Sequence, residues 1–344
     1  MKTSFKVLKA GNGDSLLIRF LGEDGNFKNI IIDGGNRKSE YERYLKSEIL
    51  DTYQNNECID LMVITHTDQD HVKGIQYLLK DSDINKDMIK SIWFNSFDRA
   101  QIVDNNDISF IESSKVRDMF ADADIKRDSN IVVEEHKVVD FFGAKITILS
   151  PLQEDVDKLI IKNSEDISAV GCDYSYSILE LIDQNSKIFK DEIEELDNTI
   201  ENRVSIAMLL EFKDLSLLLL GDANPDVIED SIRKILIARG DDRLNVDFAK
   251  LSHHGSHRSL SLSLTSLIQC NNFIISTNGK KSNLPNKLTL AKLLTKLYRS
   301  KEAVQFIFNY EDVVEALNFK EEELTQYNFK CLKPNYDNGY VINL

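Results

Sequence analysis

The segment THTDQDHVKG, residues 65–74, constrains this chain more than any other, because it places two histidines and two aspartates within six positions. It directly follows the apolar run CIDLMVI, residues 58–64, which predicts a short strand buried on both faces. Apolar residues then recur at helical spacing over residues 72–79, so His71 is expected at the start of a helix. Imidazole and carboxylate groups crowded at a strand end predict a metal site.

Three further segments end an apolar strand and then present ligand-type residues. They are DGG at 33–35, GD at 221–222 and SHHGSH at 252–257. Taken singly, each is also typical of ordinary turns or of structural histidines. Loops at strand ends are where a rigid sheet displays reactive groups, so the four segments together are expected to converge on one cluster.

The alternation of strand-like and helix-like segments predicts an α/β fold. Strands mixed with helices in both halves indicate two mixed β-sheets back to back, with helices outside. A hairpin is expected around Lys213, and a helix is expected to begin at Pro225 and to end at Gly240. We expect a single domain over residues 1–344, with an acidic and polar insertion at 153–200 and a C-terminal extension from about 311.

Charge and composition limit the kinds of binding partner and the cellular location that we expect. The net charge of −15 argues against a globally basic nucleic-acid-binding surface, although a metal cluster can supply local positive potential. The one basic stretch runs from Lys280 to Lys301 and is typical of a solvated helix face, with a phosphate track as the alternative. No apolar run approaches the ~20 residues that span a bilayer. The four scattered cysteines read as reduced thiols, so a cytoplasmic protein without a membrane partner is expected.

The order of these motifs resembles the metallo-β-lactamase superfamily. Its HxHxDH signature corresponds to HTDQDH here, and the HxDxDH variant is similar to the hydrolase domain of the ComEC-type DNA-uptake competence protein. The segments AGNGDSLLIRF, IIIDGG, NRVSIAMLLEF, LLLLGD and LSHHGSHRS are similar to further motifs of that family, in the same order. The resemblance implies the metallo-β-lactamase αββα sandwich.

The resemblance also implies a ligand set for two divalent metal ions. His66 and Asp68 would face the first ion, Asp70 and His71 the second, and Asp222 would bridge the two. His253 would complete the second site, with His254 as the alternative ligand or as a partner behind the ligands. Two more residues are expected at or behind the cluster, namely Asp33 and Asn202. Four are expected to contact the substrate, namely Ser205, Ser256, His257 and Lys287.

Two departures from the family pattern bear on the metal. Asp68 stands where a zinc enzyme would place a histidine, and no histidine lies near Asn202–Ser205, where the superfamily supplies its third imidazole to the first ion. His136, in VEEHKVVDF, is expected to be a surface residue. Carboxylates in place of imidazoles favour harder, oxygen-preferring ions, so Mn²⁺ is predicted ahead of Zn²⁺.

The resulting prediction is a metal-dependent phosphodiesterase or nuclease that acts on DNA through a hydroxide bridging two metals, with Asp70 orienting that nucleophile. The preference for single-stranded DNA follows from the resemblance and from the acidic body. Two alternatives stay open: a lactone or thioester hydrolase, and a weakly metallated sensor or assembly module that binds a protein partner.

Overall fold

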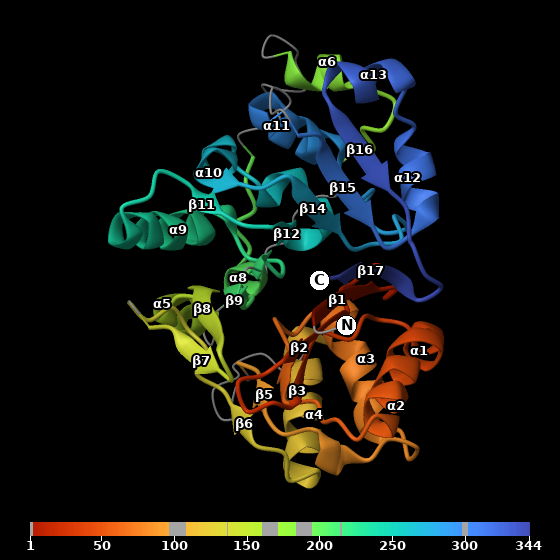
Figure 1. Cartoon of the computed structure of the whole chain (residues 1–344), viewed down its shortest axis with the longest axis vertical. Coiled ribbons are helices and arrows are strands. Elements are labelled where there is room, and N and C mark those ends of the chain that lie inside the picture. Colours follow the sequence, from red (N-terminus) through yellow and green to blue (C-terminus); the bar gives the residue numbers. More distant parts are fainter. Residues whose placement is uncertain are drawn as a thin grey trace.

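The computed structural model describes residues 3–95, 108–135, 137–159, 171–183, 195–213, 215–297 and 302–344. Two mixed β-sheets dominate this part of the chain, with helices on their outer faces (Figure 1). The predicted α/β class, two mixed sheets flanked by helices, is therefore confirmed. His136 lies outside the described residues, so its predicted surface position is untested.

The first sheet is built from the two ends of the chain and the first third of the sequence. Its strand order is β17-β1-β2-β3-β4-β5-β6, antiparallel from β17 to β3 and parallel from β3 to β6. Its strands are β1 (Thr3–Leu8), β2 (Leu16–Leu21), β3 (Phe27–Ile32), β4 (Leu61–Val63), β5 (Ile92–Trp93), β6 (Arg127–Asp128) and β17 (Gly339–Asn343).

The second sheet mirrors this plan, with order β16-β15-β14-β12-β10-β9-β8-β7, parallel from β16 to β10 and antiparallel from β10 to β7. Its strands are β7 (Val139–Phe141), β8 (Ala144–Ser150), β9 (Ala207–Phe212), β10 (Leu215–Leu219), β12 (Phe248–Lys250), β14 (Asn272–Ile275), β15 (Val304–Phe308) and β16 (Phe329–Leu332). A separate pair joins β11 (Leu244–Asn245) to β13 (Ile268–Gln269).

Helices follow the strands and cover the sheets. Those before β7 are α1 (Lys38–Glu40), η1 (Tyr41–Leu45), α2 (Lys46–Gln54), α3 (Gln69–Lys80), η2 (Lys86–Met88) and α4 (Ile108–Asp122). The later ones are α5 (Gln153–Leu159), α6 (Ile178–Ile182), α8 (Ile200–Arg203), α9 (Pro225–Arg239), η4 (Ser252–Gly255), η5 (His257–Ser259), α10 (Leu262–Leu267), α11 (Lys287–Leu297), α12 (Glu311–Leu317) and α13 (Glu321–Gln326). None of the described helices has the length and apolar character that crossing a membrane requires.

Apolar side chains fill three layers. Alternation along β10 shows how: Leu217 joins the layer between the sheets, and its neighbour Leu218 packs outward under α9 with Ile232. On the other side, α3 contributes Ile75 to the layer that covers the first sheet. Each such fully buried side chain contributes about 1.5–3 kcal/mol relative to exposure. The continuous apolar run of β10 is thus explained by burial on both faces.

The hairpin and the helix ends predicted for the second half of the chain agree with the structure. The strands β9 and β10 form the expected hairpin, with Lys213 in the left-handed region at its turn. Helix α9 has Pro225 in its first turn and ends at Gly240, whose φ of 72° suits a residue without a Cβ.

The expected insertion and the C-terminal extension both pack onto the body where they are described. In the insertion, Ile178 and Leu181 of α6 join the apolar layer outside the second sheet. The carboxylate of Asp173 caps α11 by accepting from the backbone N–H groups of Lys287 and Leu288, at 2.9 and 2.8 Å. After residue 311, β16 extends the second sheet and β17 pairs with β1 of the first.

Candidate metal centre

The segment after β4 forms a tight entry into α3. Asp68 is the N-cap residue, and its carbonyl oxygen accepts from the N–H groups of His71 and Val72 at 3.0 and 3.1 Å. Asp70 and His71 therefore lie in the first turn of α3, where both are buried. The predicted helix start at His71 agrees with this geometry, which places His71 beside Asp222 and Asp70 beside His254.

Glycines allow other loops to approach α3 closely. Gly34 and Gly74 face each other so tightly that a Cβ on Gly74 would collide with the carbonyl oxygen of Gly34. A Cβ on Gly13 would likewise collide with the carbonyl oxygen of Asp70. The DGG and GNGD turns are therefore glycine-rich because α3 packs against them.

This packing places Asp33 behind His71. One oxygen of Asp33 accepts from the backbone N–H of Thr65 at 2.9 Å. The other accepts from the Thr65 hydroxyl at 2.7 Å and lies 2.8 Å from Nδ1 of His71. Asp33 is fully buried, and these contacts fix the orientation of the His71 ring, while its predicted role behind a metal ligand stays a prediction.

Asp222 lies at the centre of the cluster. It follows β10, its backbone N–H donates to Ser205 Oγ at 3.0 Å, and only 3% of the residue is exposed. Four histidine Nε2 atoms surround its Oδ2, namely those of His71 at 3.3 Å, His254 at 3.7 Å, His66 at 3.8 Å and His253 at 4.0 Å. The structure thus brings Asp222 together with the four histidines, and the bridging role that the resemblance implies for it stays a prediction.

The HHGS turn presents two consecutive histidines to the cluster. His253 and His254 both adopt left-handed backbone conformations, with φ of 46° and 54°, and the His253 N–H donates to the Gly221 carbonyl at 3.0 Å. This unusual pair of dihedrals lets neighbouring side chains face the same aspartate. His254, rather than His253, lies beside Asp70, with Nε2 3.9 Å from Oδ2 of Asp70.

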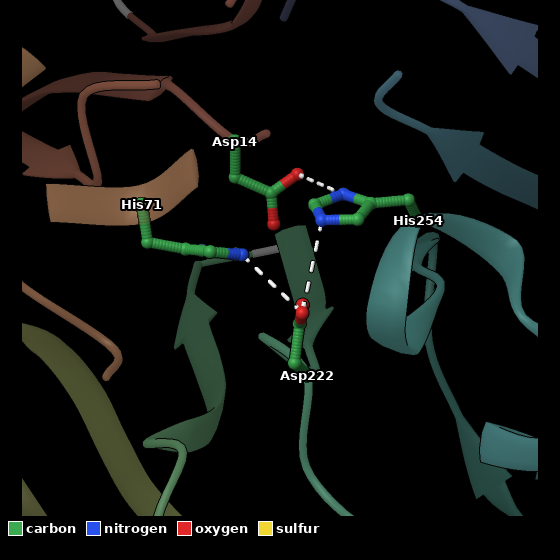
Figure 2. Close-up of side chains that lie close together, drawn as sticks. All are labelled: Asp14, His71, Asp222 and His254. Carbon is green, nitrogen blue, oxygen red and sulfur yellow. Dashed lines mark ion pairs between the residues drawn. The ribbon is translucent and has the colours of Figure 1, made fainter. Parts of the chain in front are cut away.

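Asp14, for which we predicted no role, completes the group around His254 (Figure 2). Its Oδ1 lies 3.4 Å from Nδ1 of His254, which also donates to the Ser276 carbonyl at 3.0 Å. Its other oxygen pairs with the buried ammonium of Lys250, which donates to the Gly221 carbonyl as well. Asp14, His71, Asp222 and His254 each offer a ligand atom within 4.8 Å of the others.

A second supporting group stands behind His253. Nδ1 of His253 lies 3.5 Å from Oδ2 of Asp197 and 3.2 Å from Nδ2 of Asn202. The Asn202 amide in turn donates to Oδ2 of Asp197 at 2.5 Å. Asn202 therefore lies behind a ligand-type residue. Asp197 comes from the polar region expected to be an insertion, and nothing in its local sequence marked it.

His66 is held differently, by hydroxyl groups. Its Nδ1 lies 3.1 Å from Oγ1 of Thr65 and 3.4 Å from Oγ of Ser205. Its Nε2 lies 3.7 Å from Oδ2 of Asp68, whose side chain is 38% exposed. Asp68 thus forms the open side of the cluster beside His66.

The charges in the cluster stabilise one another. Burial raises the pKa of Asp222, but the neighbouring His71 and His254 outweigh it and hold this pKa well below its ordinary value. Burial opposes protonation of His71, yet Asp222 and Asp33 raise its pKa well above the ordinary value. In Asp14, Lys250 and His254 overcome burial and lower the pKa to about 2. The carboxylates of Asp222 and Asp14 are therefore ionised and paired with the basic groups around them.

The donor set fits a divalent metal. Among the described residues, the Nε2 atoms of His66, His71 and His254 are buried without a hydrogen-bond partner, as is Oδ1 of Asp222. Buried polar atoms without partners are rare in folded proteins unless a ligand or ion satisfies them. Each of these nitrogens belongs to a ring whose Nδ1 is held from behind by an oxygen, as metal-binding histidines usually are.

The predicted substrate contacts are less accessible than expected. Ser205, Ser256, His257 and Lys287 are each no more than 6% exposed. The Lys287 ammonium lies over the Phe319 ring at 4.6 Å, so a contact with substrate does not fit its position. The expectation of a solvated helix face fails at Lys287 and at Lys292, which is fully buried and donates to the carbonyls of His257 and Leu260. At these two positions, the first residue and the middle of α11, the helix packs into the protein instead of facing water.

Comparison with known proteins supports the fold. Residues 8–149 match the family model described as the metallo-beta-lactamase superfamily. The matched range includes Asp14, Asp33 and the HTDQDH segment. The two mixed sheets flanked by helices are consistent with the metallo-β-lactamase fold that this match indicates. No curated protein matches the chain. Nothing in these matches singles out the competence subfamily.

Several solved structures are similar over the whole chain at low identity. The metallo-beta-lactamase fold protein YhfI from Bacillus subtilis is 12% identical over 100% of both chains, with a TM-score of 0.43. Zn(2+)-bound PqqB from Methylobacterium extorquens is 11% identical over 99% of this chain and 100% of its own, with a TM-score of 0.43. A diphosphatase from the PhnP family is 12% identical over 100% of this chain and 98% of its own, with a TM-score of 0.40.

Proposed function

We propose that this chain is a metal-dependent hydrolase with two divalent ions, and that its substrates are phosphodiesters. The observation that carries the proposal is the ring of four histidine Nε2 atoms, 3.3–4.0 Å from Oδ2 of Asp222, with carboxylates on both flanks. This donor set suits two ions that share one carboxylate. Divalent ions, when bound, make water nucleophilic near neutral pH and stabilise negative charge on phosphoryl oxygens.

The ligands divide into two groups that share Asp222. His71, His254 and Asp70 form the more enclosed group, because their ion-pair contacts with Asp222 and with each other are buried. His66 and Asp68 form the more open group. His253 lies on the solvent-facing side, 33% exposed, and is available to the open group. On this assignment His253 takes the place of the third imidazole that is missing near Asn202–Ser205.

The side chains around the ions then have separate tasks. Asp70 would hold the enclosed ion and orient the attacking water. Asp33 would fix the ring of His71 from behind, and the Ser276 carbonyl, with Asp14 beside it, would fix that of His254, so that both Nε2 atoms would be left for an ion. The Ser205 hydroxyl anchors the loop of Asp222 by accepting from the backbone N–H of Asp222. Ser205 is not expected to reach the substrate.

Manganese stays the first choice of ion, because Asp68, Asp70 and Asp222 offer hard oxygen ligands. Zinc in the enclosed, histidine-rich group is the alternative. One manganese ion and one zinc ion would also suit the site, since the two ligand groups contain different numbers of histidines.

The preference for single-stranded DNA derives from the sequence resemblance. In the described part of the stretch from Lys280 to Lys301, Lys287 and Lys292 are buried, so they offer a long duplex no continuous lysine track. A flexible strand that reaches the ions end-first needs only a few phosphate contacts, corresponding to a salt slope of about 0.7 per contact.

The burial of Lys287 and Lys292 also favours a second candidate function, the hydrolysis of a small acyl compound such as a lactone or thioester. Few cations are needed to bind such a substrate. A non-catalytic module that binds a protein partner is the third candidate.

The test is a panel of a labelled single strand, a duplex, a bis-aryl phosphodiester and a lactone, each with Mn²⁺ and with the Asp70→Ala variant as control. Phosphodiester cleavage that the variant lacks would support the proposal. Cleavage of the lactone alone would replace it with the acyl hydrolase. Silence on all four substrates, with metal bound, would favour the module.

A further inference from the structure

Among the residues that the structure describes, an exposed cation contacts the cluster. Lys281 lies on the loop between β14 and α11, and its Nζ lies 3.0 Å from Oδ2 of Asp70. Its side chain is 61% exposed, whereas the Asp70 side chain is 9% exposed. Lys250 also pairs with an acid of the cluster, but it is buried. Lys281 therefore stands at the border between the buried acids and the solvent.

The backbone around Lys281 is anchored on both sides. Before it, the N–H of Asn278 donates to the Gly11 carbonyl at 2.8 Å. After it, the N–H of fully buried Asn286 donates to the Gly255 carbonyl at 3.1 Å, and its Oδ1 accepts from the His257 N–H at 3.0 Å. These bonds tie the loop to the turn that precedes β2 and to the HHGS turn. The ammonium group can swing on its side chain, but its backbone stays beside the cluster.

Asp70 cannot pair with Lys281 and bind a divalent ion equally well at the same time. The Lys281 ammonium lies 3.0 Å from Oδ2 of Asp70, so the two groups form an ion pair at the position where a metal would need that carboxylate. A divalent ion on Asp70 neutralises that carboxylate and repels the ammonium at short range. The ammonium then loses its partner while it stays within reach of anything bound to the ions.

We propose that Lys281 is the substrate-binding residue for a phosphoryl oxygen, and that it occupies Asp70 only until metal binds there. Lysine is a compact, strongly hydrated cation that suits a single phosphoryl oxygen. The substrate class is therefore one whose reacting group is anionic, a phosphate ester, and not a neutral lactone. This inference rests on the proposed metal-dependent hydrolase and adds the group that selects its substrate.

Lys280 provides a matched control. It is the neighbouring residue, carries the same charge and is exposed. Its charge acts on Glu40, where it opposes the rise in pKa caused by burial, and the structure gives it no contact with the cluster acids. Lys280→Ala thus removes one positive charge from the same loop without the contact to Asp70.

The first measurement is the affinity for Mn²⁺ by competition with a chelator, in the full-length wild type, Lys281→Ala and Lys280→Ala. Removal of the competing ammonium should make Lys281→Ala bind Mn²⁺ severalfold more tightly than the other two proteins. Equal affinity in all three, or equal tightening in both variants, would overturn the competition for Asp70.

The second measurement is the binding of inorganic phosphate to the three metal-loaded proteins. Lys281→Ala should bind phosphate about tenfold or more weakly, as expected for the loss of one charged hydrogen bond, and Lys281→Arg should recover most of the affinity. Lys280→Ala should match the wild type. Unchanged phosphate affinity in Lys281→Ala would overturn the assignment. Neither measurement needs turnover, so a chain that fails to hydrolyse phosphodiesters can still support or contradict the role of Lys281.

Discussion

Oδ2 of Asp33 lies 2.8 Å from Nδ1 of His71, and the opposite nitrogen of that ring lies 3.3 Å from Oδ2 of Asp222. A fully buried carboxylate thereby decides which nitrogen of a ligand-type histidine is free. Asp14 and Asp197 lie farther from the Nδ1 atoms of His254 and His253, at 3.4 and 3.5 Å, and the hydrogen-bond partners of those atoms are the Ser276 carbonyl and the Asn202 amide. Asp33 is therefore the aspartate that holds its histidine by a direct hydrogen bond.

The Asp33→Asn variant tests this relation. The amide can turn its NH₂ group toward Nδ1 and favour the tautomer whose Nε2 carries a proton, so we expect a loss of about 10- to 100-fold in metal affinity. Chelator competition with Mn²⁺ measures this loss, and circular dichroism checks that the variant folds. An affinity equal to that of the wild type would show that Asp33 only anchors Thr65.

The two histidines of the HHGS turn should act on different ions. His254→Ala removes a ligand from the enclosed group, and His253→Ala removes one from the open group, so each variant should keep one tightly bound ion. Elemental analysis after limited dialysis gives the count, and Co²⁺ spectra distinguish the remaining sites. Loss of both ions in one variant and of neither in the other would contradict a division of these ligands between two sites.

Asp68 should influence the choice of metal. In Asp68→His, an imidazole replaces a carboxylate beside His66, which moves the open group toward the ligand set that zinc prefers. The chelator-stripped wild type should recover activity best with Mn²⁺, and the variant should shift toward Zn²⁺. Tightly bound zinc in both wild-type sites, with no recovery in Mn²⁺, would refute this interpretation of Asp68.

His257 should make the protein sensitive to acid. Burial, together with the charges of Lys292 and Arg258, lowers its pKa from 6.5 to about 3. Above pH 6.5 the ring is neutral in both the folded and the unfolded chain, and as pH falls from 6.5 toward 3 only the unfolded chain gains the proton. Stability is therefore lost across that window, by up to about 1.4 kcal/mol per pH unit.

In His257→Gln this contribution disappears. Between pH 7 and pH 5 the variant should lose roughly 2 kcal/mol less of its free energy of unfolding than the wild type, measured by urea denaturation at both pH values. Identical losses in the two proteins would mean that His257 is not held neutral in the fold.

Local patterns were enough to predict much of the site. The crowding in HTDQDH, with helical spacing after it, predicted both a cluster and a helix that begins at His71. Asp222 and the HHGS turn were predicted because a strand-ending Gly-Asp and paired histidines are ligand-type residues at strand ends. The αββα arrangement followed from strands mixed with helices in both halves.

Residues whose role depends on distant partners were missed. Asp14 reads as part of a glycine turn, and its contact with His254 joins positions that are 240 residues apart. Lys250 reads as the polar position of a strand, and only its pairing with Asp14 explains its burial. Asp197 lies in a polar stretch that gave no periodic signal. The pairing of β17 with β1 likewise joins the two ends of the chain, which local periodicity does not encode.

The central claim is that Asp222 holds two ions together, and the metal content of the purified chain tests it most directly. After loading with Mn²⁺ and desalting, elemental analysis should find about two equivalents per chain in the wild type and at most one in Asp222→Asn. Asp226→Asn is the matched control, because Asp226 is 58% exposed on α9 and should leave both ions in place. A wild type without metal, or an Asp222→Asn variant that retains both ions, would contradict the account.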